Sequence, residues 1–365
     1  MRSFVHPPGA MSIRRALRAW ALPVLVLAMA AAPASEAMAD AAPPPYQLSA
    51  HVSLGAGKRW DYVTLDGSAG RIYLAHADKV EVIDVQTRTR VGTISGLQGT
   101  HGVATAPLLG RGFISDGKAN AVVIFDLRSL AVLRAVPVGR NPDAIVFDPL
   151  TGRIAVFNGA SHDATILDAA TGTVITASLP LGGKPEFARL DSAGRAYVNI
   201  EDTAEVAIVD LKEGRVLRRY SIAPCDEPTG LAITPMGQLI SVCHNHLAVL
   251  SDPATGSVLA TAPIGERPDG VVFDDGYAFS ANGGDGTISV LAVSAGTAAA
   301  IATIPSRRTA RTIEVDPRTH TLYLPSLAEA PVGVPATAGA AAADAGGARQ
   351  TTEADAIEIL VVTRQ

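Results

Sequence analysis

Short apolar runs separated by turn residues recur along most of the chain. Between Asn141 and Gly182, the runs AIVF, RIAVF, ATILDA and TVITASL are rich in Val, Ile, Phe and Thr, and each is too short for a stable helix. The intervening segments DPLTG, NGASHD and ATG carry the Asp, Asn, Pro and Gly residues that favour tight turns. This stretch predicts a four-stranded antiparallel meander, a sheet that needs similar neighbours to bury both of its faces.

The pattern recurs in seven units. When the units are aligned on the second residue of their first apolar run, the spacings are 40 to 43 residues. The seven aligned residues are Asp61, His101, Asp143, Glu186, Thr229, Asp269 and Arg311. A second register agrees, because the third runs end in aspartates at steps of 42, namely Asp84, Asp126, Asp168 and Asp210. This period predicts an all-β, seven-bladed propeller of four-stranded antiparallel blades, with a β-sandwich of coincidental spacing as the alternative.

The ends of the repeat array predict how the ring closes. Residues 46–55 form an expected strand before the first unit, and the last unit stops after a third strand at 357–362. We expect the N-terminal strand to complete the last blade, which would remove an open sheet edge. The Ala-, Gly- and Pro-rich segment 328–355 lies between the second and third strands of that blade, and it is predicted to be a disordered loop.

Residues 1–39 predict a secretory signal peptide. Three arginines precede an apolar segment at 20–32, which is too short to span a bilayer, and a small-x-small cleavage sequence follows it. Translation could begin at Met1 or at Met11. Residues 40–365 are then a single propeller domain, which we expect to be a monomer in the bacterial periplasm with no membrane span after cleavage.

Charge and motifs exclude some classes of function. The formal charge is −5 for the chain and about −8 without residues 1–39, so an acidic surface without a basic stripe argues against nucleic acid as a partner. With 48% hydrophobic and 18% charged residues, the composition is that of a globular domain. The chain contains no GxSxG, P-loop, HExxH or CxxCH motif.

The ring of aligned residues is the main candidate site. Propellers as a family place the start of each inner strand on the same face as the loop between the second and third strands, at the mouth of the central channel. Clustered carboxylates there attract cations, although any propeller would have a hydrated polar funnel at this place. The candidate ligand-binding residues are Asp61, His101, Asp143, Glu186, Asp269 and Arg311.

Five histidines are candidates for a divalent metal ion, because imidazole is a common ligand of transition metals. One is in the ring, and the other four fall in predicted loops on the same face. They are His76, His101, His162, His244 and His246. They come from four different blades, so they need not converge, and loops are also where exposed histidines usually occur.

The two cysteines map to the same face of the fifth blade. Cys225 precedes its inner strand, and Cys243 ends its second strand. An exported protein can form disulfides, so we expect a Cys225–Cys243 bond. The alternative is a soft metal site of Cys243, His244 and His246, with or without Cys225.

The units resemble those of exported YncE-like proteins with YVTN-type, WD40-like propeller repeats. NPDAIVFDPLTGRIAVFN, RPDGVVFD and RAYVNIEDTAEVAIVDL carry this resemblance, which extends from about Tyr46 to the end apart from the Ala-rich segment. Units 1, 2 and 7 depart from the pattern, with WDY, HG and RT where Pro-x-Gly is usual, and this alters the ring at Asp61, His101 and Arg311. The resemblance implies a seven-bladed periplasmic propeller but no single activity.

These observations favour a non-catalytic binding or scaffold protein. The ring would hold a small polar ligand, a divalent metal ion or a periplasmic protein partner, and no motif demands another cofactor. The alternative is a metal-assisted hydrolase, lactonase or lyase, in which the carboxylates and His101 hold an ion that activates water.

Overall fold

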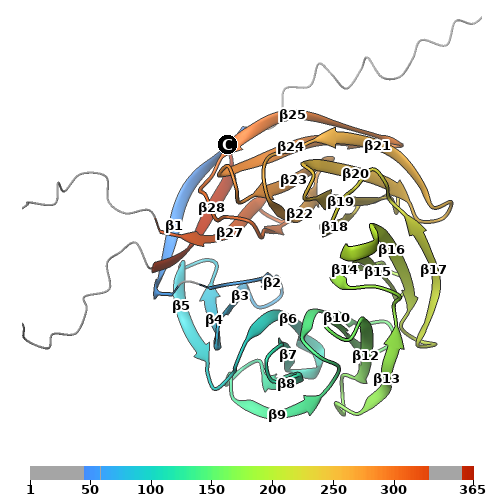
Figure 1. The fold of residues 1–365 in the computed structure, drawn as a ribbon. Helices are drawn as coiled ribbons and strands as arrows, with labels where there is room; N and C mark the ends of the chain where they lie inside the picture. Colours follow the sequence, from blue (N-terminus) through green and yellow to red (C-terminus); the bar gives the residue numbers. More distant parts are fainter. Residues whose placement is uncertain (1–44, 58, 329–355) are drawn as a thin grey trace, which may run out of the picture. The chain divides into compact units, whose positions relative to one another are not determined.

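Seven four-stranded antiparallel sheets form the propeller in this computed structural model, which describes residues 45–57, 59–328 and 356–365. The sheets stand side by side around a centre, as Figure 1 shows. This confirms the fold predicted from the repeat. The predicted signal peptide lies outside the described residues, and so does all but the first residue of the predicted loop 328–355.

Each blade follows the chain from an inner to an outer strand. Blades 1 and 2 consist of β2 (Val63–Asp66), β3 (Arg71–His76), β4 (Lys79–Asp84), β5 (Thr89–Ile94), and β6 (Thr100–Ala106), β7 (Arg111–Asp116), β8 (Ala121–Asp126), β9 (Val132–Pro137). Blades 3 and 4 consist of β10 (Pro142–Asp148), β11 (Arg153–Asn158), β12 (Asp163–Asp168), β13 (Val174–Pro180), and β14 (Pro185–Leu190), β15 (Arg195–Ile200), β16 (Glu205–Asp210), β17 (Arg215–Ser221). Blades 5 and 6 consist of β18 (Pro228–Ile233), β19 (Leu239–Cys243), β20 (Leu247–Asp252), β21 (Ser257–Pro263), and β22 (Pro268–Asp274), β23 (Tyr277–Asn282), β24 (Thr287–Ser294), β25 (Thr297–Pro305). The described residues also include two short 3-10 helices, η1 (Pro107–Leu109) in blade 2 and η2 (Glu201–Thr203) in blade 4.

The seventh blade joins the two ends of the propeller. It contains β26 (Glu314–Asp316), β27 (Thr321–Leu327), β28 (Ala356–Arg364) and, as its outer strand, β1 (Tyr46–Ala56). β1 pairs antiparallel with β28, so that Tyr46 lies opposite Arg364. This confirms the predicted closure, which leaves no unpaired edge at the junction of the ends.

The core lies between the blades. The middle strands are buried on both faces by neighbouring sheets and are therefore almost continuously apolar, whereas an outer strand such as β9 is mostly exposed. The buried apolar side chains of the described residues fall into seven clusters, one at each contact between adjacent blades. Every blade therefore depends on both of its neighbours for burial.

The aspartates at the ends of the third strands stabilise turns. Oδ1 of Asp84 accepts hydrogen bonds from the backbone amides of Gln86 at 3.0 Å and Thr87 at 2.7 Å. Equivalent bonds form at Asp126, Asp168, Asp210 and Asp252. These backbone hydrogen bonds lower the pKa values of Asp84, Asp126 and Asp168. The regular aspartates are thus explained by turn geometry.

The inner strands differ in length, and the difference bears on the ring. β2 has 4 residues and β26 has 3, whereas the inner strands of the other blades have 6 or 7. Units 1 and 7 are two of the three that depart from the Pro-x-Gly pattern, and in them Asp61 and Arg311 precede the strand.

Among the described residues, no helix is long and apolar enough to cross a membrane.

Candidate functional site

All seven ring residues line one cavity of about 1380 Å³, which we call the channel mouth. Residues between the second and third strands of several blades line it as well. These include Asp78, Lys118, Glu201, His244 and His246. The inner-strand starts and these connections therefore lie on the same face of the propeller, as propeller geometry led us to expect.

One side of the channel mouth is neutralised by Arg311. Its Nη1 lies 3.1 Å from Oδ2 of Asp269, and its Nη2 lies 3.9 Å from Oδ1 of Asp61. Nη2 also donates to the backbone oxygen of Trp60 at 2.9 Å, which fixes the guanidinium. Burial raises the pKa of Asp269 to about 6, although the charge of Arg311 opposes this shift.

A second basic residue, Lys184, neutralises the blade 4 side. Its Nζ lies 3.3 Å from Oε2 of Glu186 and forms an ion pair with Glu201 in η2. Burial, together with the negative charge of nearby Asp143, raises the pKa of Glu186 to about 9 in spite of Lys184.

The third side brings together Asp61, His101 and Asp143 from three consecutive blades. Nδ1 of His101 lies 2.7 Å from Oδ2 of Asp61 and 3.7 Å from Oδ1 of Asp143. Asp143 is 7% exposed, and its Oδ1 has no hydrogen-bond partner. Burial and the neighbouring carboxylates of Asp61 and Asp269 raise the pKa of Asp143 well above its usual value.

The remaining ring residue, Thr229, has a structural position. Its hydroxyl lies 3.0 Å from the backbone oxygen of Pro268 in the next blade and 3.2 Å from that of Val242 in its own. It is 3% exposed, so it links blades 5 and 6 and offers little surface to the cavity.

The five candidate histidines are dispersed. His76 is the last residue of β3 rather than part of a loop, and it is buried 3.5 Å from Glu81. His162 is an exposed turn residue. His244 and His246 are exposed at the channel mouth, and His244 pairs with Glu227 at 2.7 Å. Among the described residues, only His101 belongs to a group of three or more potential metal ligands.

Cys225 and Cys243 form a disulfide across 18 residues, with Cα atoms 5.4 Å apart. The predicted bond is therefore present. Both sulfurs are consumed in it, so the alternative site of thiolates with His244 and His246 does not form in this state.

Tyr62 closes the channel below the mouth. It comes from blade 1, yet its hydroxyl donates to the backbone oxygen of Glu186 in blade 4 at 3.1 Å. Its ring packs edge-on against Phe187, with centroids 5.0 Å apart. Because blades 1 and 4 lie on opposite sides of the ring, the side chain spans the channel.

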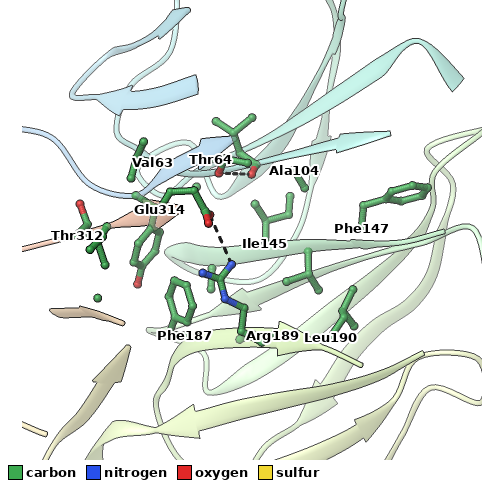
Figure 2. Close-up of a pocket in the computed structure, with 18 of the residues that line it drawn as sticks. Val63, Thr64, Ala104, Ile145, Phe147, Phe187, Arg189, Leu190, Thr312 and Glu314 are labelled. Atoms are coloured by element: carbon green, nitrogen blue, oxygen red, sulfur yellow. Dashed lines mark hydrogen bonds and ion pairs between the residues drawn. The ribbon is translucent and has the colours of Figure 1, made fainter. Parts of the chain in front are cut away.

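Beyond Tyr62, later residues of the inner strands line a second cavity of about 360 Å³, which we call the distal cavity. Figure 2 shows Ile145, Phe147, Phe187 and Leu190 around it, with Arg189 directed toward Glu314. Nη1 of Arg189 lies 3.8 Å from Oε2 of Glu314. Apolar side chains thus share the lining of the distal cavity with one loose ion pair and with Thr64, Thr105 and Thr312.

Sequence reasoning missed the basic residues Arg59, Lys184 and Arg267, which also line the channel mouth. Each stands immediately before the residue that opens its unit, two positions before the ring residue. Aligning the units two positions earlier would have found them. The ion pairs of Lys184, however, depend on side-chain directions that the repeat does not specify.

Fold and site together define a seven-bladed, WD40-like propeller with a charged channel mouth and a smaller distal cavity. Similar solved structures agree on the fold. The structure entitled RRP9 WD40 repeats has a TM-score of 0.70 at 10% identity, covering 88% of this chain and 99% of that one. The structure of U3-55K has a TM-score of 0.69 at 10% identity, covering 87% of this chain and 99% of that one. Kuenenia stuttgartiensis hydrazine synthase has a TM-score of 0.64 at 14% identity, covering 72% of this chain and 91% of that one.

At these identities the likeness establishes the fold alone. No model of a known protein family matches the chain, and no curated protein matches it. The fold is compatible with a binding or scaffold role, which must be argued from the channel mouth.

Proposed function

We propose that the chain is an exported, YncE-like propeller that binds a small polar ligand with positive charge in its channel mouth. The observation that carries this proposal is the buried carboxyl group of Asp143, a residue that lines the channel mouth and whose Oδ1 has no hydrogen-bond partner. A buried polar atom without a partner is costly, and a ligand that donates to it recovers that cost. The signal-like residues 1–39 and the YVTN-type motifs support export to the periplasm.

The dimensions and charges of the channel mouth suit such a ligand. A cavity of about 1380 Å³ can contain a metabolite-sized molecule together with water. Asp61 and Asp143 offer acceptors for an ammonium group or a cation. Arg311 and Lys184 lie on the other sides and could pair with a carboxylate or phosphate of the same molecule.

A ligand panel tests this proposal. Purified protein is screened by thermal shift against amino acids, polyamines, amino sugars and neutral sugars, and hits are titrated by calorimetry. Asp143→Asn should abolish the response to a cationic hit, whereas Arg189→Gln in the distal cavity should leave it unchanged. No hit in the panel, combined with specific retention of a periplasmic protein, would replace the proposal with a scaffold role.

A metal-assisted hydrolase or lactonase is the second candidate, favoured by the proximity of Asp61, His101 and Asp143. A bound ion there could lower the pKa of a coordinated water and generate a nucleophile. Turnover of a lactone, ester or phosphoester that is lost with chelator and with His101→Ala would support it. Absence of turnover in protein shown to contain a metal ion would exclude it for those substrates.

A further inference from the structure

The cluster of Asp61, His101 and Asp143 has the geometry of a metal site. Each residue offers one ligand atom, and these atoms all lie within 4.8 Å of one another. The distances from Nδ1 of His101 to the two carboxyl oxygens, 2.7 and 3.7 Å, bracket the separation of about 3 Å between ligands that each lie about 2.1 Å from one ion. Small side-chain rotations would therefore place all three around a common centre.

The second observation is the unpaired oxygen within the cluster. The side chain of Asp143 is 10% exposed, and its Oδ1 has no hydrogen-bond partner while it faces Nδ1 of His101. A buried acceptor oxygen is stable in such a place only with a hydrogen-bond donor or a cation beside it. Hydrogen bonding among the other members of the cluster does not satisfy this atom.

The backbone around the cluster holds its members in place across three blades. The backbone oxygen of Asp61 accepts from Thr312 at 3.0 Å, and that of His101 accepts from the amide of Tyr62 at 3.1 Å. Ser115 links blades 2 and 3, because its Oγ donates to the backbone oxygen of Asp143.

Gly117 leaves the space that the imidazole needs. A Cβ at this position would lie 2.6 Å from Nε2 of His101, so a side chain there would displace the ring. The His101 ring is therefore fixed by Gly117 on one side and by Asp61 on the other.

We propose that Asp61, His101 and Asp143 bind one divalent transition-metal ion on the blade 1 to 3 side of the channel mouth. One imidazole and two carboxylates suit Zn²⁺, Mn²⁺ or Co²⁺ better than Ca²⁺ or Mg²⁺, which prefer oxygen ligands alone. Three protein ligands leave coordination positions open toward the cavity. The inference deepens the proposed function and rests on it, because the ion would be part of what the polar ligand contacts.

The charge of Arg311 does not prevent binding. Its closest atom to Asp61 is 3.9 Å away, whereas it approaches Asp269 to 3.1 Å. The guanidinium is thus held mainly by Asp269, so Asp61 remains available to an ion.

The test is calorimetric titration of tag-free, chelator-treated protein with ZnCl₂ and MnCl₂, together with the visible spectrum of the Co²⁺ form. Wild type should bind one equivalent, and His101→Ala and Asp143→Asn should each weaken binding by at least about 100-fold. The matched control is His320→Ala. His320 also pairs with an aspartate, Asp274 at 2.6 Å, but belongs to no three-ligand group, so the variant should bind like wild type.

Two results would overturn the inference. One is the absence of binding by wild type even at millimolar metal. The other is equal binding by wild type and both cluster variants, which would indicate adventitious binding at exposed His244 and His246. Thermal melts of His101→Ala and Asp143→Asn show that each variant is folded, and His101→Gln replaces the first if it is not. Repeating the ligand panel on metal-free protein separates the proposals, because a ligand that binds there supports the proposed function even when the metal site fails.

Discussion

The two ends of the central channel differ in the number of charged side chains that line them, although many of the same inner strands line both. On β10, Asp143 lines the channel mouth and Ile145 lines the distal cavity. On β14, the mouth contains Glu186, whereas the distal cavity contains Phe187 and Leu190. Both strands thus change from an acidic to an apolar side chain within one or two residues, and β14 presents a charged side chain again at Arg189 in the distal cavity.

The difference between the two cavities shows at which positions packing determines the type of side chain. Residues beyond Tyr62 contact neighbouring blades closely, so apolar side chains stabilise them. The ring residues line a large cavity, so packing against neighbouring blades does not account for their charged side chains. Acids buried there, with pKa values raised by their surroundings, are more readily explained by binding than by stability.

The largest expected effect comes from removing the partition itself. Tyr62→Ala joins the mouth to the distal cavity and should lower the free energy of unfolding by about 3–5 kcal/mol, because a buried aromatic ring is lost. Tyr62→Phe keeps the ring and loses one hydrogen bond, so about 1 kcal/mol is expected. Urea denaturation measures both. A loss for Tyr62→Ala no greater than that for Tyr62→Phe would show that the ring does not seal the channel.

Exchanging the chemistry of one strand should give the next largest effect. Ile145→Asp buries a carboxyl group in the apolar part of the channel, where Ile145 is 8% exposed, and should cost about 3 kcal/mol of unfolding free energy. Asp143→Asn is the matched change at the mouth and should cost less than about 1 kcal/mol. Similar losses for the two variants would mean that the ends are not distinct environments.

The pH dependence of stability should include a contribution from Glu186 in a defined window. Burial and Asp143, Asp269 and Glu201 raise its pKa from 4.5 to about 9, against the opposing charge of Lys184. Between these values the folded state keeps a proton that the unfolded state releases, so the free energy of unfolding falls as pH rises. The fall from about pH 5 to pH 8 should exceed about 1 kcal/mol in denaturation curves.

Glu186→Gln is the control for that window, because the amide is neutral in both states. Its unfolding free energy should be less dependent on pH over the same interval. An unchanged slope in the variant would assign the dependence to other groups.

The smallest predicted effect concerns Arg311. Arg311→Gln removes a positive charge 3.9 Å from Asp61 and should tighten Mn²⁺ or Zn²⁺ binding several-fold, about 1 kcal/mol or less at this exposed surface. The pKa of Asp269 should rise above its present value of about 6, because Arg311 opposes the effect of burial. Carboxyl NMR titration measures the second change. Arg189→Gln in the distal cavity should alter neither quantity.

The sequence predicted the fold well because the repeat carries its own register. Seven inner-strand starts in phase predict that Asp61, His101 and Asp143 share one cavity, and the matching positions of Cys225 and Cys243 predict the disulfide. Two aligned registers suffice for this, because propeller blades repeat their geometry.

The side-chain contacts within the channel could not be predicted, because the repeat does not specify them. Tyr62 has the sequence context of an ordinary inner-strand residue, yet it reaches across the channel to blade 4. The pairing of Lys184 with Glu186 and Glu201 depends on η2, the short helix between β15 and β16 that contains Glu201. His76 was expected in a loop, but β3 extends to include it, and its side chain is buried against Glu81.

The most direct test of the channel mouth as a cation site is a crystal structure. Crystals of the protein are grown with Mn²⁺ or Zn²⁺, and anomalous data are collected at the absorption edge of the metal. We predict one strong anomalous peak about 2.0–2.2 Å from Asp61, His101 and Asp143, and no peak in the distal cavity. A peak confined to His244 or His246, or no peak at the channel mouth at millimolar metal, would contradict the account.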